Sequence, residues 1–487
     1  MKVFISKDEK KIAIYSLIVL LVIMFPVFSS GVYYLDDAYR AVSGKPSMVN
    51  QGRPLANFIL SLFSSKGRLL DISPGFHVLS IMEMSVFAVV IRRIFPVLTV
   101  LGSVCAMLLV FLCPFYMQNI SYKYDVVTMT TANLFSVISV YSIFCRKNTI
   151  AISFVFSVIC FLAILTTYQT ALNMAVIIFL TKCFVMVKET DCFLIKRSVF
   201  YTAAMFLSLV LYKVSLPLWF SPTWYSSYSS ESLSVGGLFE GMAINFMTFY
   251  SFILKALGKY YIMGSVFLCC FFCIGYIKSS SDKVLSFVVS SVFSVFLFLC
   301  IPGVMLILKH PPIEPRVLSA TGAVLASLFI LSIYNNIVFL KKLSVIVVVF
   351  VIFKSAVLFM AYGNVLSIIS KDIDFYINSS IDKLNEISKR EKINRFTIHG
   401  ILRDSRYIDS LKRENFLFNY IIPPELGVPY SFYYNVQIYS RNNYLEYVEY
   451  NDSGLEKNSN SFDKLYDGGW FVINKDHGFL IIEFPSY

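Results

Sequence analysis

The sequence predicts an all-α polytopic membrane protein that crosses a bilayer about eleven times and ends in a small C-terminal α/β domain. The composition is the first reason: of 487 residues, 57% are hydrophobic and only 15% are charged. An ordinary soluble domain has about 25% charged residues. The second reason is that windows of about 20 apolar residues, the length that a helix needs to cross a bilayer, recur along most of the chain.

The first predicted span is Ile12 to Ser29, which we interpret as an uncleaved helix with its N-terminus in the cytoplasm. Further spans are predicted near 75–91, 97–117, 126–144, 150–167, 169–187, 198–219, 260–277, 284–308, 319–340 and 343–361. If the N-terminus is cytoplasmic, every turn that is predicted on the cytoplasmic side of the membrane contains a basic cluster. These clusters are Arg92-Arg93, Arg146-Lys147, Lys188 with Lys196-Arg197, Lys278 with Lys283, and Lys341-Lys342. Cytoplasmic loops are enriched in Lys and Arg, so this pattern supports the orientation.

This orientation leaves loops 31–74, 220–259 and 309–318 and the polar tail on the outer face. We therefore predict a transmembrane domain at 1–363 and an outer domain at 364–487. In the tail, apolar residues recur at helical spacing from Ser370 to Lys392. Strand-like runs follow, among them Phe396-Thr397-Ile398 and Trp470-Phe471-Val472-Ile473. The tail thus predicts a small α/β domain.

The net charge of +12 does not indicate nucleic-acid binding, because the basic residues lie in short connections and form no stripe interleaved with aromatic residues. The four histidines show no ligand spacing, and the chain has no glycine-rich phosphate loop. We therefore predict no metal site and no soluble nucleotide-sugar fold. A sugar donor for such a protein would come from the membrane.

The candidate chemistry begins where the first apolar run ends, at Asp36 and Asp37. Acidic side chains beside a bilayer are costly and usually functional. Sugar transfer from a phosphate-linked donor to a hydroxyl needs a base, and either aspartate could serve, the two titrating as a coupled pair. The alternative is that they only end the first helix and hydrate it. A further alternative, which the sequence leaves open, is that the two aspartates bind a divalent cation.

Cations that could hold the departing phosphate are Arg40, Arg53 and Arg316, with Lys123 as a weaker candidate. A guanidinium grips phosphate in a bidentate manner and stabilises the charge that develops on it. The alternative is an interfacial arginine that reaches lipid headgroups. Prolines 311, 312 and 315 stiffen the loop that carries Glu314 and Arg316.

Further polar groups at predicted outer helix ends are Asp125, Tyr168 and Gln169. Each could contact sugar hydroxyls, and each could equally cap a helix or anchor it at the interface. Together with Glu314, they complete the predicted substrate-binding set. Within the spans, Glu83 and Lys354 are the clearly charged residues.

The run Asp36-Asp37-Ala38-Tyr39-Arg40 with Gly52-Arg53-Pro54-Leu55 resembles the serotype-converting O-antigen glucosyltransferases, which temperate phages of enteric bacteria often carry. Tyr124-Asp125, Thr167-Tyr168-Gln169 and Pro315-Arg316-Val317-Leu318 resemble the same family in the expected order. The resemblance covers the membrane portion of the chain and not its tail.

The resemblance implies a GT-C architecture in the bacterial inner membrane, with the active site and the C-terminal domain in the periplasm. It implies transfer of glucose from undecaprenyl-phosphate-glucose to O-antigen sugars of lipopolysaccharide, which converts the serotype. When the roles known in the family are carried over to this chain, Asp36 or Asp37 is the candidate base, and Arg53 and Arg316 are the candidate phosphate binders. Residues 364–487 would then recognise the acceptor. The family implies no cofactor.

Rival interpretations are an O-antigen polymerase, a lipid A-modifying glycosyltransferase, and a transporter or flippase for a lipid-linked glycan. A transporter predicts charges deep inside spans and two matching halves. Only Glu83 and Lys354 meet the first condition, and no matching halves are visible. The polar residues that gather on one face favour an enzyme.

Overall fold

The structure is a computed structural model of the chain. It describes residues 6–145, 149–190, 192–220, 223, 227, 228, 230–400, 404–423, 434–438, 445–448, 463–469, 471–476 and 478–484. The predicted basic cluster Arg146-Lys147 and Trp470 of the predicted strand run lie outside the described residues.

Most of the described chain is helical, and nine of its helical segments are long and apolar enough to cross a membrane. They are α1 (Lys7–Phe28), α4 (Gly75–Ile94), α7 (Asp125–Phe144), α8 (Ile150–Thr167), α9 (Ala171–Lys188), α10 (Leu194–Trp219), α13 (Lys259–Lys278), Pro315–Ile333, which joins η4 (Pro315–Leu318) to α15 (Ala320–Ile333), and α16 (Val338–Glu391). Two shorter apolar helices, α5 (Val100–Phe111) and α14 (Lys283–Leu299), occupy the other two predicted spans. The prediction of a polytopic helical membrane protein is confirmed.

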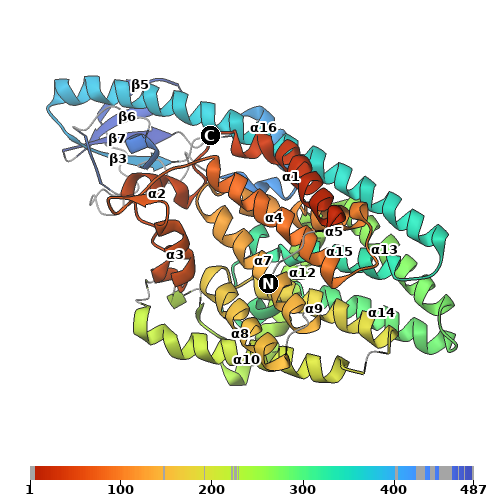
Figure 1. Ribbon diagram of the computed structural model, residues 1–487. Coiled ribbons are helices and arrows are strands. Elements are labelled where there is room, and N and C mark those ends of the chain that lie inside the picture. The colour runs from red at the N-terminus through yellow and green to blue at the C-terminus, as the bar shows by residue number, and fades with distance from the viewer. Residues whose placement is uncertain are drawn as a thin grey trace.

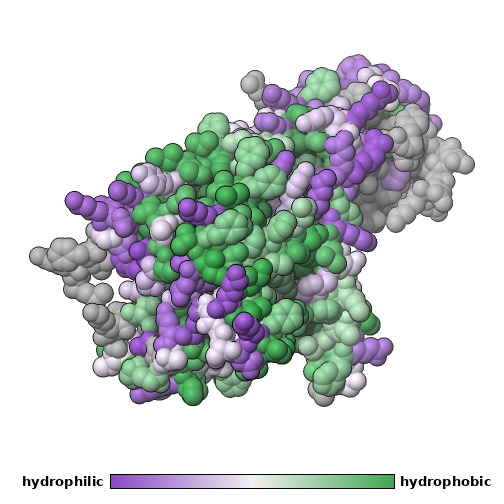
Figure 2. All heavy atoms as spheres, turned by 90° about the vertical axis from the view of Figure 1, so that its right-hand side faces the viewer, coloured by the Kyte–Doolittle hydropathy of each residue, from purple (hydrophilic) through white to green (hydrophobic). Residues whose placement is uncertain are grey.

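The outside of this bundle is apolar, as a bilayer requires. Large hydrophobic side chains are exposed along several helices, including Val214, Leu218, Val284 and Phe353. Hydrophobic side chains accordingly cover a broad area of the bundle in Figure 2. Because the exposure of such a large apolar surface to water is unfavourable, these side chains are suited to contact with lipid tails.

Helix α16 crosses the predicted domain boundary at residue 363 without a break. Its first half is the last apolar span, and its second half buries Ile373, Ile377, Ile381 and Leu384 on one face. In Figure 1 it runs along one edge of the molecule from the helical bundle to the C-terminal sheet. One continuous helix therefore connects the membrane part to the C-terminal part.

The predicted outer loops contain regular structure of their own. Loop 31–74 holds α2 (Asp36–Ser43), η1 (Val49–Gln51), α3 (Pro54–Ser61) and the hairpin of β1 (Ser64–Ser65) with β2 (Arg68–Leu69). The region 220–259 holds η2 (Val235–Gly237) and α12 (Leu238–Ala256). Short helices α6 (Tyr116–Ser121) and η3 (Gly303–Ile307) complete this end of the bundle.

The C-terminal part contains a five-stranded mixed sheet in the order β4-β3-β7-β6-β5. Its strands are β3 (Arg395–Gly400), β4 (Glu446–Tyr447), β5 (Asp463–Asp467), β6 (Val472–Asp476) and β7 (Phe479–Phe484). Two helices, α17 (Arg406–Glu414) and α18 (Phe418–Ile421), follow β3. β3 pairs in parallel with β4 and β7, while β6 pairs antiparallel with β5 and β7. The predicted small α/β domain is confirmed.

The C-terminal domain is joined to the membrane part by buried hydrogen bonds. The hydroxyls of Tyr34 and Tyr362 both donate to the carbonyl of Ile421, at 3.0 and 2.9 Å. The Tyr362 hydroxyl also lies 2.8 Å from the Ser121 hydroxyl. We call this end of the bundle, which bears α2, α3 and the C-terminal domain, the domain end (Figure 1).

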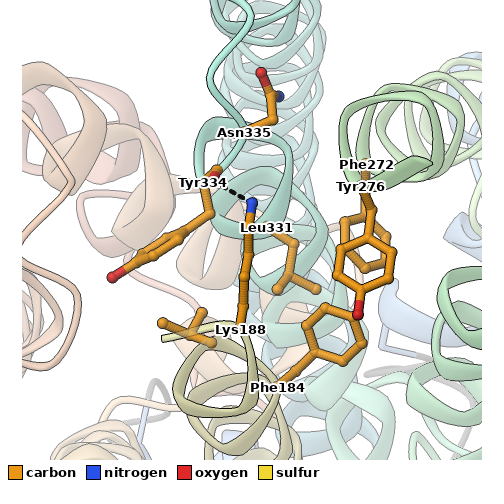
Figure 3. Close-up of a pocket in the computed structure, with 8 residues that line it drawn as sticks. Phe184, Lys188, Phe272, Tyr276, Leu331, Tyr334 and Asn335 are labelled. Atoms are coloured by element: carbon orange, nitrogen blue, oxygen red, sulfur yellow. Dashed lines mark hydrogen bonds between the residues drawn. The ribbon is translucent and has the colours of Figure 1, made fainter. Parts of the chain in front are cut away.

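A small cavity lies at the opposite end of the bundle, between α9, α13 and α15. Figure 3 shows Phe184, Phe272 and Tyr276 around it, with Lys188 donating to the carbonyl of Tyr334 at 2.8 Å. Its volume is about 10 Å³, which is barely the space of one water molecule. No sugar fits in a cavity of this volume.

Candidate functional site

The aspartate pair opens helix α2, and the chain turns sharply to present it. Leu35, just before the helix, has φ +48°, which a side chain with a Cβ rarely adopts and which costs roughly 1–3 kcal/mol. Asp36 and Asp37 then occupy the first turn, where negative charge is favoured by the helix dipole. Gly44 ends the helix with φ +65°, which glycine adopts without strain.

The two aspartates occupy different environments. The Asp37 side chain is fully buried, and its Oδ2 accepts hydrogen bonds from the backbone N–H groups of Tyr34 at 3.2 Å and Lys123 at 2.7 Å. Its Oδ1 accepts from the N–H of Tyr124 at 3.4 Å. The Asp36 side chain is 52% exposed, and its Oδ2 lies 3.9 Å from the Arg40 guanidinium. Asp37 thus joins the start of α2 to the chain just before α7, while Asp36 faces solvent.

Arg40 lies among three carboxylates. Its Nη1 is 3.0 Å from Asp125 Oδ1 and 3.8 Å from Asp37 Oδ1. Its Nε donates to the Pro46 carbonyl at 3.3 Å. Arg40 and Asp125 are both almost completely buried. Because a buried charge is costly unless it is paired, Arg40 joins α2 firmly to the start of α7.

Arg53 is placed by the local chemistry of the Gly-Arg-Pro run. Gly52 has φ +75°, and a Cβ there would lie only 2.8 Å from the Tyr212 hydroxyl, which itself donates to the Gly52 carbonyl at 2.9 Å. Pro54 is the first residue of α3, a position that suits its fixed φ and missing N–H. Glycine and proline therefore fix the backbone on both sides of Arg53.

The Arg53 side chain points into the protein without a carboxylate partner among the described residues. Its guanidinium carbon lies 5.3 Å from the centre of the Tyr168 ring, a cation–π distance. Its buried Nε donates no hydrogen bond to any described residue. A buried guanidinium N–H without a partner is suited to an anionic ligand.

Arg316 lies near Arg53 and is held from several sides. Its Nη1 donates to the Tyr122 hydroxyl at 2.6 Å, and its Nε lies 2.5 Å from Glu314 Oε2. Its backbone N–H donates to Gln118 Oε1 at 2.9 Å. Its carbonyl accepts from the Tyr168 hydroxyl at 3.0 Å, so the ring that stacks on Arg53 also holds the Arg316 backbone.

The charges of these residues act on one another across the cluster. Asp125 experiences the charges of Arg40, Asp36, Arg53 and Arg316. Arg53 is destabilised as a cation first by burial and also by Arg316 and Arg40, so its pKa lies below the ordinary arginine value. Two arginines that repel one another at the edge of the bundle form an electropositive pair.

Burial also shifts the pKa of Asp37. Desolvation is the largest cause and raises the pKa, the Arg40 guanidinium lowers it, and the nearby Asp125 raises it, with a net pKa of about 8. The same Asp125, with Asp36 and Asp37, outweighs the burial of Arg40 and raises the pKa of that guanidinium above its ordinary value. Arg40 therefore stays charged, and Asp37 retains a proton more readily than an ordinary aspartate.

Two predicted residues make their side-chain hydrogen bonds outside this cluster. The Lys123 ammonium donates to the Gly31 carbonyl at 2.9 Å and lies 4.0 Å from Asp71 Oδ2, and burial lowers its pKa. Gln169 donates to the Tyr212 hydroxyl at 3.2 Å, behind Gly52. Tyr122, which contacts Arg316, was not predicted, because no feature of its sequence neighbourhood distinguishes it from other interfacial tyrosines.

Among the described residues, no group of three or more His, Cys, Asp or Glu side chains is arranged to hold a metal ion. The three carboxylates Asp36, Asp37 and Asp125 do converge, but the Arg40 guanidinium lies between them. The Arg40 guanidinium thus offsets part of the negative charge of these carboxylates.

Comparison with known proteins shows the family to which the chain is related. Residues 25–368 match the family described as Glucosyl transferase GtrII. The chain is also similar to a protein of Salmonella phage P22 described as "Uncharacterized 55.3 kDa protein in gtrB 5'region", with 28% identity over 251 residues. That alignment covers 51% of this chain and 51% of the phage protein, or about half the length of the relative. No solved structure matches the chain.

Proposed function

Because the chain belongs to the Glucosyl transferase GtrII family, we propose that it transfers glucose from undecaprenyl-phosphate-glucose to a sugar of the O-antigen repeat. It is a multi-pass membrane glucosyltransferase with a phage-associated homologue. The donor, the acceptor and the resulting serotype conversion are the proposed part. The observation that carries the proposal is the electropositive pair of Arg53 and Arg316 beside the aspartates of α2.

In the proposed site, Arg53 and Arg316 hold the phosphate that links glucose to the lipid. The stacking of Arg53 on Tyr168, and the contacts of Arg316 with Tyr122 and Glu314, hold both guanidinium groups in place. Fixed cations stabilise the charge that grows on a departing phosphate without rearranging during the reaction. Such rigid placement is what a leaving phosphate requires.

Asp36 is the proposed base, because it is the exposed member of the pair. Its carboxylate takes the proton of the acceptor hydroxyl as the hydroxyl oxygen attacks C1 of glucose. The bond between C1 and the phosphate oxygen breaks, and its electron pair leaves with the lipid phosphate. The configuration at C1 is inverted, and Asp36 later returns the proton to water. Asp37 and Arg40 are positioning residues that hold α2 in place.

We further propose that the domain end faces the periplasm and that 364–487 forms a periplasmic domain, with 1–363 as the transmembrane domain. The basic residues Arg92, Arg93 and Lys188 lie in the last turns of α4 and α9, at the end away from α2. The same is true of Lys278 on α13. Positive charge at that end favours its placement in the cytoplasm of the bacterial inner membrane.

The proposal is tested by mass spectrometry of lipopolysaccharide O-chains from host cells with and without this protein, with the lipid-linked glucose pathway supplied. We expect one hexose to be added per repeat, and we expect the addition to be lost when Arg53 and Arg316 are both replaced by Gln. O-chains of changed length with unmodified repeats would indicate a polymerase. A modified lipid A with unchanged repeats would indicate another acceptor, and no change would favour the transporter.

A further inference from the structure

A large cleft at the domain end lies beside the aspartate pair and not within it. Its volume is about 830 Å³, within the range of about 300–1,000 Å³ that is usual for ligand sites. One wall is formed by the last turn of α2 and by the chain from Arg68 to Asp71. The other wall comes from the C-terminal domain: β3, β4 and the short helix 434–438. Tyr33 and Tyr124 line it from the membrane part.

The cleft is physically connected to the proposed base. Its α2 wall contains Ala41 and Val42, and Ala41 follows Asp36 by about 7.5 Å along the helix axis. Its lining residue Tyr124 donates its backbone N–H to Asp37. A short stretch of glycan lying along α2 would therefore reach from the cleft to the Asp36 carboxylate.

Hydrogen bonds within the first wall and one aromatic contact between the two walls hold the cleft in shape. The Arg68 guanidinium donates to the carbonyls of Ala41 at 2.7 Å and Val42 at 2.9 Å, which caps the end of α2. The rings of Tyr39 on α2 and Tyr434 in the C-terminal domain meet edge to face at 5.4 Å. The cleft is therefore largely formed before any ligand arrives.

The chemistry of the lining matches an uncharged polyol. The lining combines aromatic rings with side chains that donate or accept hydrogen bonds, namely Arg68, Asp71, Gln437 and Glu446. Hydroxyl groups of a sugar both donate and accept hydrogen bonds, and the apolar face of a sugar ring packs on an aromatic ring. The walls carry one basic and two acidic side chains, and this slight excess of negative charge favours a neutral saccharide over a phosphate.

One buried polar atom points independently to a ligand. The Tyr124 side chain lines the cleft and is completely buried. Its hydroxyl has no hydrogen-bond partner among the described residues. A buried hydroxyl without a partner is unfavourable, and a sugar hydroxyl in the cleft would provide the missing partner.

We propose that this cleft binds the acceptor glycan, so that the C-terminal domain and the α2 wall together select which saccharide is glucosylated. The inference rests on the proposed function for the identity of the acceptor. Gln437 is exposed on the C-terminal wall, and it is therefore the residue through which the cleft can be blocked without disturbing the core.

The test measures binding separately from transfer. The probe is O-chain polysaccharide freed from lipopolysaccharide by mild acid, titrated into the full chain in detergent. We expect Gln437→Trp to weaken binding by about tenfold or more, because a large side chain occupies the cleft. The matched control is Asp463→Trp, which places the same side chain on the exposed edge strand β5, at the far edge of the sheet.

A second variant, Tyr124→Phe, removes only the unpartnered hydroxyl. It should weaken binding several-fold while leaving the melting temperature unchanged or higher. Equal binding by wild type, Gln437→Trp and Tyr124→Phe would overturn the inference, as would a wild-type chain that does not bind the polysaccharide. Binding that depends on the cleft, in a chain that transfers no glucose, would support the cleft and refute the proposed reaction.

Discussion

At the scale of the residue, two adjacent aspartates differ because the backbone gives them different surroundings. Asp37 is enclosed by three backbone N–H groups, from Tyr34, Lys123 and Tyr124, whereas Asp36 is half exposed. The sequence predicted the pair as a candidate base without distinguishing its members. The distinction comes mainly from Lys123 and Tyr124, which lie about 86 positions away in the chain. No local sequence pattern relates their N–H groups to Asp37.

This difference predicts opposite stability effects. Asp37→Ala leaves three backbone donors without an acceptor, and since an unsatisfied buried donor costs about 1–3 kcal/mol, the change should cost at least about 3 kcal/mol of stability. Asp36→Ala should change stability by no more than about 0.5 kcal/mol, because its side chain is exposed. Thermal unfolding of both purified variants in one detergent measures the contrast. Equal melting temperatures would contradict the assignment of Asp37 as a positioning residue.

Asp37 also predicts a pH dependence of stability. Its pKa is raised by burial to about 8 in the folded protein, against about 3.9 in an unfolded chain. Between these values the folded state binds the proton and the unfolded state does not, so the free energy of unfolding decreases as pH rises. The contribution is complete below about pH 4 and lost above about pH 8.

The matched variant is Asp37→Asn, which has nearly the same shape and does not titrate. Between pH 5 and pH 8.5, the melting temperature of the wild type should fall more steeply than that of Asp37→Asn, by roughly 3 °C or more. Parallel curves would show that Asp37 is ionised throughout this range.

At the scale of the element, short motifs act through backbone geometry. The Gly-Arg-Pro run was predicted to matter because of Arg53, and the structure places Gly52 and Pro54 where each one's backbone preference is used. The contact of Gly52 with Tyr212 joins α3 to α10 across a long stretch of sequence, which no periodicity in the sequence could indicate.

The Gly52 turn gives a prediction with a built-in control. Gly52→Ala forces a Cβ to within 2.8 Å of the Tyr212 hydroxyl at φ +75°, and it should destabilise the protein by about 1–2 kcal/mol. Adding Tyr212→Phe removes the clash, but it also removes the hydrogen bond to the Gly52 carbonyl and leaves the unfavourable φ, so it should restore only part of the lost stability. Full restoration, or no effect of the single change, would show that the turn is not held as described.

Helix α16 marks a limit of what composition predicts. The apolar span and the amphipathic helix of the tail were both predicted, at 343–361 and at 370–392, but as separate elements. The structure joins them in one 54-residue helix. The change from apolar to polar residues reports the change of surroundings, and the helix continues through Gly363 and Asn364 because no proline interrupts it.

At the scale of the whole molecule, the apolar spans and the small terminal α/β domain were predictable because burial in lipid leaves a strong compositional signal. The grouping of Asp36, Arg40, Asp125, Arg53 and Arg316 was anticipated in part, because all lie at helix ends on one predicted face. The cleft was not predictable, since its two walls come from residues more than 300 positions apart in sequence order.

The proposed orientation is tested with a native cysteine. Cys192 is exposed in the turn between α9 and α10, at the end that we place in the cytoplasm. In intact spheroplasts, a membrane-impermeant maleimide should label a Glu446→Cys variant on the C-terminal domain but not Cys192, which should react only after permeabilisation. The reverse pattern would place the aspartates in the cytoplasm.

The central claim is most directly tested by glucosyl transfer with the purified full chain. Undecaprenyl-phosphate-glucose carrying radiolabelled glucose is incubated with unmodified lipopolysaccharide and either wild-type protein or Asp36→Asn. We predict that wild type moves the label to the O-chain with release of lipid phosphate. We predict that Asp36→Asn is slower by roughly 10²–10⁴-fold at an unchanged melting temperature. Transfer by Asp36→Asn at the wild-type rate, or no transfer by the wild type, would contradict the account.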